Sequence, residues 1–109
     1  MSVGVDPERI GERLRDRDHL YVLSVRDGRV HAVSHRGVVN GADVTIATAS
    51  DSLRARLAGD ERVTLLWPPA RTQVAEYDDY SLVADGNARV TATSVIVTVS
   101  SAVLHRPAI

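Results

Sequence analysis

A short stretch in the middle of the chain combines hydroxyl and guanidinium groups with a predicted helix start. Its members are Thr48, Ser50, Ser52, Arg54 and Arg56. The first N–H groups of a helix carry a partial positive charge and lack backbone partners, and arginine suits phosphate, so this stretch is a candidate anion site. The alternative is a plain helix capped by Ser50 or Asp51, with its arginines in water. Local chemistry favours the capped helix, because the Asp51 carboxylate would compete for the same N–H groups.

A second group of polar residues lies on a predicted strand and comprises His31, Ser34, His35 and Arg36. His31 and His35 are an even number of residues apart, so a regular strand places both on one face. The chain has no cysteine, and no carboxylate lies nearby at ligand spacing, so we expect no metal site. We expect both histidines on the water-facing side of a barrel wall. The alternative is a group that hydrogen-bonds a planar ligand.

Three of the four aromatic residues, Trp67, Tyr77 and Tyr80, lie near the Pro68-Pro69 pair. Tryptophan and tyrosine are enriched at interfaces, so the group would line a cleft for a flat ligand or the seam of a dimer. Trp67 as ordinary core filling is an equally good interpretation. No nucleophile–base–acid trio and no glycine-rich nucleotide loop is present in the sequence.

The bulk composition restricts the class of protein. A length of 109 residues predicts one domain over 1–109, and a net charge of −1 argues against a nucleic-acid partner. The start of the chain lacks the pattern of a secretion signal, and no apolar run approaches the roughly 20 residues of a membrane helix. We therefore expect a cytoplasmic protein without a membrane partner.

The first half of the chain predicts a helix followed by three strands. Asp6-Pro7 is a typical helix start, and the helix is expected over about 6–17. Asp27-Gly28 and Asn40-Gly41 are hairpin turn signals. The strands expected around these turns are Leu20–Val25, Val30–Val39 and Asp43–Ala49. They form an antiparallel meander.

The second half predicts one short helix over about 51–58 and three more strands. These strands are expected over Arg62–Trp67, Tyr80–Val90 and Thr93–Val99. Asp85-Gly86-Asn87 indicates a bulge or a bend within the fifth strand. The sequence thus predicts an all-β domain with two short helices, built as a six-stranded antiparallel barrel, with a sandwich as the alternative.

The order of these pieces resembles the pyridoxamine 5'-phosphate oxidase-like split barrels, a superfamily abundant in actinobacteria. The best-matched parts are the Asp27-Gly28-Arg29 hairpin, the Asp60-Glu61-Arg62-Val63 strand entry and the strand that runs from Tyr80 through Gly86-Asn87-Ala88. The resemblance implies a six-stranded split β-barrel that forms a homodimer and binds FMN or the deazaflavin coenzyme between its subunits. It also implies phosphate contacts at Thr48 to Arg54. The predicted cofactor-binding residues are therefore Thr48, Ser50, Ser52 and Arg54, to which the two groups described above add Ser34 and Trp67.

One position departs from the family pattern. The lysine that commonly holds the phosphate is replaced here by Leu53, and Arg54 points about 100° away around the helix. Two hypotheses follow. The first is a flavin- or deazaflavin-binding oxidoreductase with an unknown small-molecule substrate, other than vitamin B6. The second is a cofactor-free dimeric module for binding or structure on the same barrel.

Overall fold

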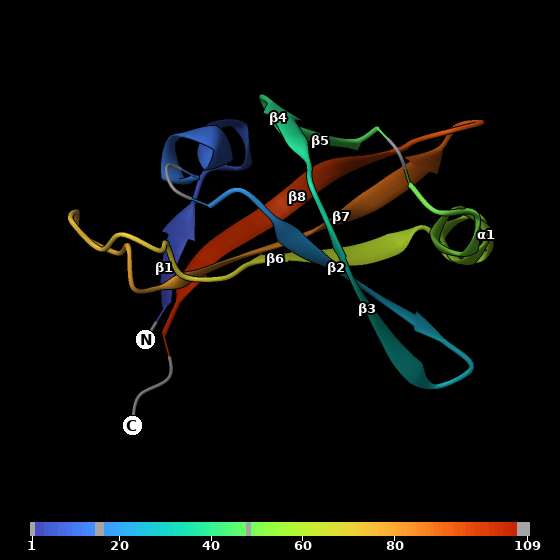
Figure 1. The fold of residues 1–109 in the computed structure, drawn as a ribbon, viewed down its shortest axis with the longest axis horizontal. Helices are drawn as coiled ribbons and strands as arrows, with labels where there is room; N and C mark the ends of the chain where they lie inside the picture. Colours follow the sequence, from blue (N-terminus) through green and yellow to red (C-terminus); the bar gives the residue numbers. More distant parts are fainter. Residues whose placement is uncertain (1, 15–16, 48, 107–109) are drawn as a thin grey trace.

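The computed structural model describes residues 2–14, 17–47 and 49–106 of the chain (Figure 1). Its strands are β1 (Ser2–Val5), β2 (Leu20–Arg26), β3 (Arg29–His35), β4 (Val38–Asn40), β5 (Asp43–Ile46), β6 (Arg62–Trp67), β7 (Ser81–Val90) and β8 (Val95–His105). Two helices accompany them: a 3-10 helix, η1 (Pro7–Arg13), and an α-helix, α1 (Asp51–Gly59). Neither helix in the described ranges has the length and apolarity needed to cross a membrane.

All strand pairs are antiparallel, and the sheet runs in the order β3-β2-β6-β7-β8-β5-β4, with β1 added beside β8. The two edge strands β3 and β4 are consecutive in the chain, separated by Arg36 and Gly37. A Cβ atom on Gly37 would lie 2.8 Å from Leu20 Cδ2 and 3.0 Å from Val44 Cγ1. The chain therefore turns this corner between β2 and β5 with glycine, and the curled sheet stays open between β3 and β4.

The expected class, antiparallel β with two short helices, is confirmed, but the strand count is eight in the described residues rather than six. One addition is β1, whose pairing with the end of β8 has no local turn signal in the sequence. The other arises because Gly37 divides the expected second strand into β3 and β4. The helix expected over about 6–17 is described as the 3-10 helix η1.

Glycine sets the chain direction where the sequence indicated. Asp27 and Gly28 have φ values of 52° and 73°, which are the two positive values of a tight hairpin turn between β2 and β3. The predicted bulge lies in β7, between Asp85 and Gly86. A Cβ on Gly86 would come within 2.3 Å of the Thr98 carbonyl oxygen, so only glycine allows β7 and β8 to approach here.

The inner face of the sheet holds the apolar core. Leu53 and Leu57, one turn apart on α1, are both buried in it, and each contributes about 1.5–3 kcal/mol by leaving water. The largest buried side chains are Ile10, Leu20, Ile46, Leu53, Leu57, Leu65, Trp67, Leu82 and Leu104. Helix α1 is thus held by its apolar side, and its polar side is left to face β3 and solvent.

Candidate functional site

The hydroxyl groups at the start of α1 are used inside the helix. Ser50 is the N-cap, and its Oγ accepts a hydrogen bond from the Leu53 N–H at 3.1 Å. Ser52 Oγ accepts one from Arg56 Nη1 at 2.7 Å. Thr48 lies outside the described residues. Two of the three hydroxyls predicted to bind phosphate therefore have partners on the same helix.

The charged groups of this segment are also paired locally. Arg54 forms an ion pair with Asp51 three residues before it and donates to the Ala49 carbonyl at 3.4 Å. The Asp51 side chain is 97% exposed, so its carboxylate lies in water. Leu53, at the position of the family lysine, is fully buried in the core. A lysine at this position would place its ammonium group among aliphatic side chains rather than on an anion.

The two remaining predicted site residues lie elsewhere. Ser34 is exposed on β3, beside Tyr21 of β2. Trp67 is 2% exposed and ends β6, next to Leu82 of β7. That strand begins near the end of α1 and rises about 3.3 Å per residue, so Trp67 is roughly 17 Å from its start. The predicted residues thus occupy three separate places within this chain.

The histidines of β3 do share one face, but the prediction that this face is the water-facing one is wrong. His31 lies opposite Ser24 and His35 opposite Leu20, and both of these partners are buried on the inner side of β2. The outward positions of β3 are taken by Val30, Ala32 and Ser34 instead. Both histidines are half-buried, because they lie on the inner side of β3, which is an edge strand of the sheet.

A groove opens where strands β2 and β6 part. Their pairing runs only from Tyr21–Leu66 to Leu23–Thr64, and the β2–β3 hairpin then diverges from β6 (Figure 1). The groove left between them has a volume of about 750 Å³. Its lining comes from five strands and the residue after α1: Leu23, Ser24, Val25, Val30, Asp60, Arg62, Val63, Thr64, Asp85, Gly86, Asn87 and Ser100.

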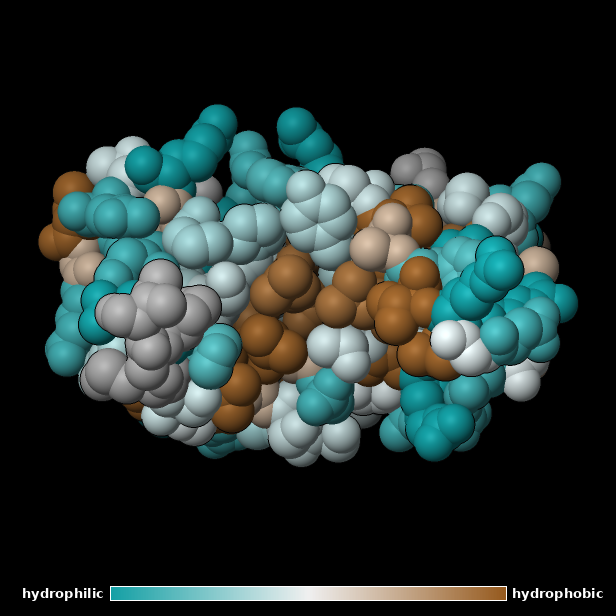
Figure 2. Space-filling model, turned by 90° about the horizontal axis from the view of Figure 1, so that it is seen from below, coloured by the Kyte–Doolittle hydropathy of each residue, from teal (hydrophilic) through white to brown (hydrophobic). Residues whose placement is uncertain are grey.

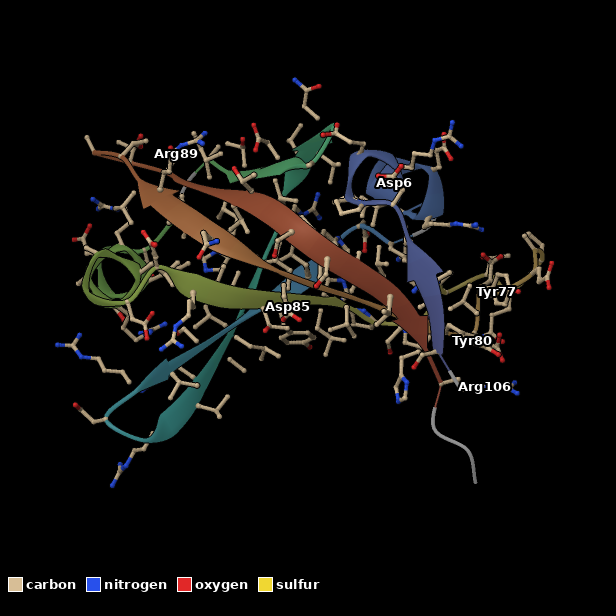
Figure 3. All side chains as sticks on the ribbon, turned by 180° about the vertical axis from the view of Figure 1, so that it is seen from behind. Asp6, Tyr77, Tyr80, Asp85, Arg89 and Arg106 are labelled. Carbon is tan, nitrogen blue, oxygen red and sulfur yellow. The ribbon has the colours of Figure 1, made fainter. Side chains whose placement is uncertain are left out.

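One wall of this split groove is apolar and the opposite wall is polar. Val25 and Val30, paired at the end of the β2–β3 hairpin, are 55% and 69% exposed. Across from them, Thr64 donates to the Asp85 carboxylate at 2.6 Å, and Ser100 donates to the Asp85 carbonyl at 3.1 Å. Figure 3 shows Asp85 in the middle of the sheet, well away from both ends.

Two charged residues, Asp60 and Arg62, line the split groove at the start of β6. Arg62 donates to the Asp60 carboxylate through Nε at 3.3 Å and Nη2 at 3.2 Å. The hydrogen bond from Arg62 lowers the pKa of Asp60, and the same bond raises the pKa of Arg62. Ser24 Oγ is buried at the split and has no hydrogen-bond partner in the part of the chain that the structure describes.

These features suit the groove to a flat organic molecule. Its volume lies within the usual 300–1,000 Å³ of small-molecule sites, which combine apolar walls with a few placed polar groups. Backbone groups of β2 and β6 that leave their shared ladder add donors and acceptors at the split. One signal in the sequence could have located this site: after Leu20 and Val22, Ser24 is a polar residue in the inward register of β2.

Two of the three aromatic residues near Pro68-Pro69, Tyr77 and Tyr80, pack against each other. The rings of Tyr77 and Tyr80 meet edge to face at 5.1 Å. Arginine guanidinium groups cover them, Arg106 at 5.2 Å from the Tyr80 ring centre and Arg13 at 5.9 Å from that of Tyr77. Tyr77, Tyr80 and Arg106 gather at one end of the sheet, opposite α1 (Figure 3). Their rings are covered by charge and do not line the split groove.

The outer face of the sheet carries a row of apolar residues beside the split groove. The register places Tyr21, Leu66, Val83 and Val103 side by side across β2, β6, β7 and β8, and all four are partly exposed. Leu23, the next outward residue of β2, links the row to the groove. Figure 2 shows a continuous hydrophobic band across this side of the molecule, bordered by hydrophilic surface.

Comparison with known sequences finds two related proteins, both longer than this chain. Uncharacterized proteins of Mycobacterium bovis and Mycobacterium tuberculosis are each 35% identical to this chain over 95 residues. The match covers 78% of this chain and 63% of each relative, so the chain spans less than two thirds of their length. No protein-family model matches the sequence.

Comparison with solved structures finds the same fold. An FAD-binding protein from Mesorhizobium loti matches with a TM-score of 0.71 and 9% identity, over 98% of both chains. The FAD-binding protein from Mycobacterium smegmatis matches with a TM-score of 0.64 and 16% identity, over 97% of this chain and all of its own. A candidate pyridoxamine 5'-phosphate oxidase from Listeria innocua matches with a TM-score of 0.58 and 11% identity, over 87% and 92%. This chain therefore has the split-barrel fold of the FAD-binding and pyridoxamine 5'-phosphate oxidase-like proteins, as the order of its sequence elements predicted.

Proposed function

From the split-barrel fold that it shares with FAD-binding proteins, we propose that this protein binds a flavin in the split groove and acts as an oxidoreductase on a small molecule. The observation that carries the proposal is the groove itself, about 750 Å³ between a valine wall and a polar wall. FMN and the deazaflavin coenzyme are the cofactors that the sequence resemblance implies. FAD joins them because two structural neighbours are described as binding it.

The residues of the groove fit a flavin ring. Val25 and Val30 offer an exposed apolar surface for its hydrocarbon part, and Arg62 and Asn87 offer donors for its oxygen-bearing edge. Ser24 Oγ, buried without a partner among the described residues, gains one when a polar ligand edge reaches it. A bound flavin would supply the hydride or electron transfer, and the protein would supply orientation and electrostatics.

We further propose that two copies of the chain pair through the apolar row of Tyr21, Leu66, Val83 and Val103. An exposed hydrophobic band of this kind, rimmed by polar residues, is typical of an interaction surface (Figure 2). The band adjoins the split groove through Leu23, so a second copy would cover the open side of the groove. Exclusion of water from a redox cofactor would follow from this cover.

The second candidate function is a cofactor-free dimeric module. The observation in its favour is the start of α1, where Ser50, Ser52 and Arg54 already have partners within the helix. No phosphate is needed to satisfy these groups. A flavin phosphate that relied on Ser50, Ser52 and Arg54 alone would be held weakly. The two candidate functions therefore make different predictions about whether added flavin binds to the protein.

Titration separates the two candidates. We expect the fluorescence of FMN, FAD or the deazaflavin coenzyme to change on binding, and Val30→Arg to weaken this binding by about tenfold or more, because it places a charge on the apolar wall. Val38→Arg is the matched control, since Val38 is also a strand valine and is also 69% exposed, but lies on β4 outside the groove. If the parent binds none of the three at millimolar concentration, the cofactor-free module replaces the oxidoreductase.

The dimer is tested by light scattering coupled to gel filtration. The expected mass is twice the 11.8 kDa of one chain. Leu66→Glu puts a carboxylate in the middle of the apolar row and should return the monomer mass, whereas Val38→Glu should not. A parent that elutes as a monomer at micromolar concentration contradicts the pairing, whatever the titration shows.

A further inference from the structure

A second feature of α1 lies on its side toward β3, away from the ion pair of Arg54. The guanidinium of Arg56 donates through Nη1 to Ser52 Oγ at 2.7 Å. Its Nε and Nη2 atoms are buried, and neither has an acceptor in the described ranges of the chain. These two N–H groups form one edge of the planar guanidinium, and this edge matches the two oxygens of a carboxylate or of a phosphate.

His35 adds a third buried nitrogen atom without a partner among the described residues. It is the last residue of β3 and lies on the inner face, where its Nε2 is buried without a partner in the described structure. Burial lowers the pKa of His35, and the positive charge of Arg56 lowers it further. The imidazole therefore lies within the electrostatic influence of the guanidinium.

Groups of this kind are costly to bury without an acceptor. Most buried polar atoms in proteins have a hydrogen-bond partner, and a buried charge with unsatisfied N–H groups loses hydration that nothing replaces. The acidic residues at the two ends of α1 do not supply the partner, because Asp51 pairs with Arg54 and Asp60 pairs with Arg62. Two nitrogen atoms of the Arg56 guanidinium and one of the His35 imidazole thus have no acceptor from the described chain, and the charge of Arg56 reaches His35.

We propose that Arg56 and His35 form a binding site for an oxyanion between α1 and β3, taking a carboxylate or phosphate group. Arg56 would bind two of its oxygens through the Nε–Nη2 edge, while Ser52 fixes the guanidinium through Nη1. His35 would donate from Nε2 to a remaining oxygen. This site does not depend on the split groove, whose lining includes neither residue.

The first test measures the thermal midpoint in inorganic phosphate and in acetate, each against sodium chloride of equal ionic strength. We expect both oxyanions to raise the midpoint of the parent and of the control Arg9→Met, an exposed arginine on η1. Arg56→Lys keeps the charge but loses the two-pronged edge, and should weaken phosphate binding by about tenfold or more. Arg56→Met should abolish the effect.

The second test observes His35 directly by imidazole NMR, with the signals assigned through His35→Gln. Phosphate should shift the His35 signals in the parent and leave them unmoved in Arg56→Met. Titrating the parent and Arg56→Met with FMN and with riboflavin then identifies the source of the oxyanion. If Arg56→Met weakens the binding of FMN but not of riboflavin, the oxyanion is a cofactor phosphate. If the parent and Arg56→Met have equal affinities for FMN, it is a free anion. The proposal is overturned if phosphate and acetate leave the midpoint and the His35 signals of the parent unchanged, or shift Arg56→Met as much as the parent.

Discussion

Two arginines of this protein, Arg17 and Arg56, have guanidinium nitrogen atoms that are shielded from water. They differ in whether these nitrogen atoms have hydrogen-bond acceptors. Arg17 is 7% exposed, and its guanidinium donates to four backbone carbonyls: Arg13 at 3.1 Å, Pro68 at 2.9 Å, Tyr77 at 3.1 Å, and Tyr80. Arg56 donates to a single side chain, Ser52, and two of its buried nitrogen atoms have no acceptor among the described residues. The chain itself thus provides hydrogen-bond acceptors for every guanidinium nitrogen atom of Arg17, and the described residues do not do so for Arg56.

The difference separates a structural cation from a ligand-binding one. Three of the acceptors of Arg17 lie at the two ends of the loop between β6 and β7, so its charge holds this loop closed. Burial lowers the pKa of Arg17, and the negative charge of Asp78 opposes that shift. Asp78 in turn accepts hydrogen bonds from the N–H groups of Val74 at 3.1 Å and Ala75 at 2.8 Å. Each of the three guanidinium nitrogen atoms of Arg17 thus has an acceptor within the chain itself.

The largest effect is expected from Arg17→Met. This change removes the donor and leaves several half-buried carbonyls unsatisfied, so it should lower the free energy of unfolding by about 3 kcal/mol. Urea denaturation measures the loss. Arg17→Lys should recover part of it, because a single ammonium group retains the charge but cannot reach all four carbonyls. A stability of Arg17→Met within error of the parent would remove the contrast with Arg56.

Much of the fold could be predicted because the local signals are strong. The turn at Asp27-Gly28, the strand Arg62–Trp67 and the bulge at Asp85/Gly86 all lie where the sequence indicated, since each depends on nearby residues. Pairing between segments far apart in the sequence could not be predicted from such local patterns. The strand β1 exists because it pairs with the end of β8, about 100 residues later, and no local pattern encodes this contact.

The site was harder to predict than the fold, because partners decide which polar residues are available. Ser50, Ser52 and Arg54 have the residue types of a phosphate site, yet their hydrogen bonds are taken within α1. His35 was singled out with the wrong orientation, since the direction of an edge strand depends on what packs under it. Arg56 belonged to the same candidate stretch, but its residue type does not reveal that its Nε and Nη2 atoms are buried without an acceptor in the described residues.

A smaller effect, of opposite sign, is expected from Arg56→Met in buffer without oxyanions. Removing a half-buried guanidinium whose inner edge lacks acceptors should leave stability unchanged or raise it by up to about 1 kcal/mol. Urea denaturation in a chloride buffer measures this, next to Arg17→Met under the same conditions. A loss as large as that of Arg17→Met would mean that Arg56 is also a structural residue with partners of its own.

The smallest effect is a difference in pH dependence between the parent and His35→Gln. The folded pKa of His35 lies below its ordinary value of 6.5, chiefly through burial and then through Arg56. Between 6.5 and this lower folded pKa the unfolded chain binds the additional proton, so stability falls as the pH is lowered through that window and rises as it is raised. We therefore expect the parent to lose more stability than His35→Gln between pH 7 and pH 5, as followed by thermal midpoints in chloride buffer. The other three histidines are common to both proteins and cancel in the comparison.

Phosphate should reduce this difference in stability loss between the parent and His35→Gln, because an oxyanion beside His35 favours the protonated imidazole and offsets the charge of Arg56. Equal losses in the parent and in His35→Gln would show that the imidazole is not destabilised by its surroundings, and that Arg56 alone distinguishes this side of α1 from the closed set of partners around Arg17.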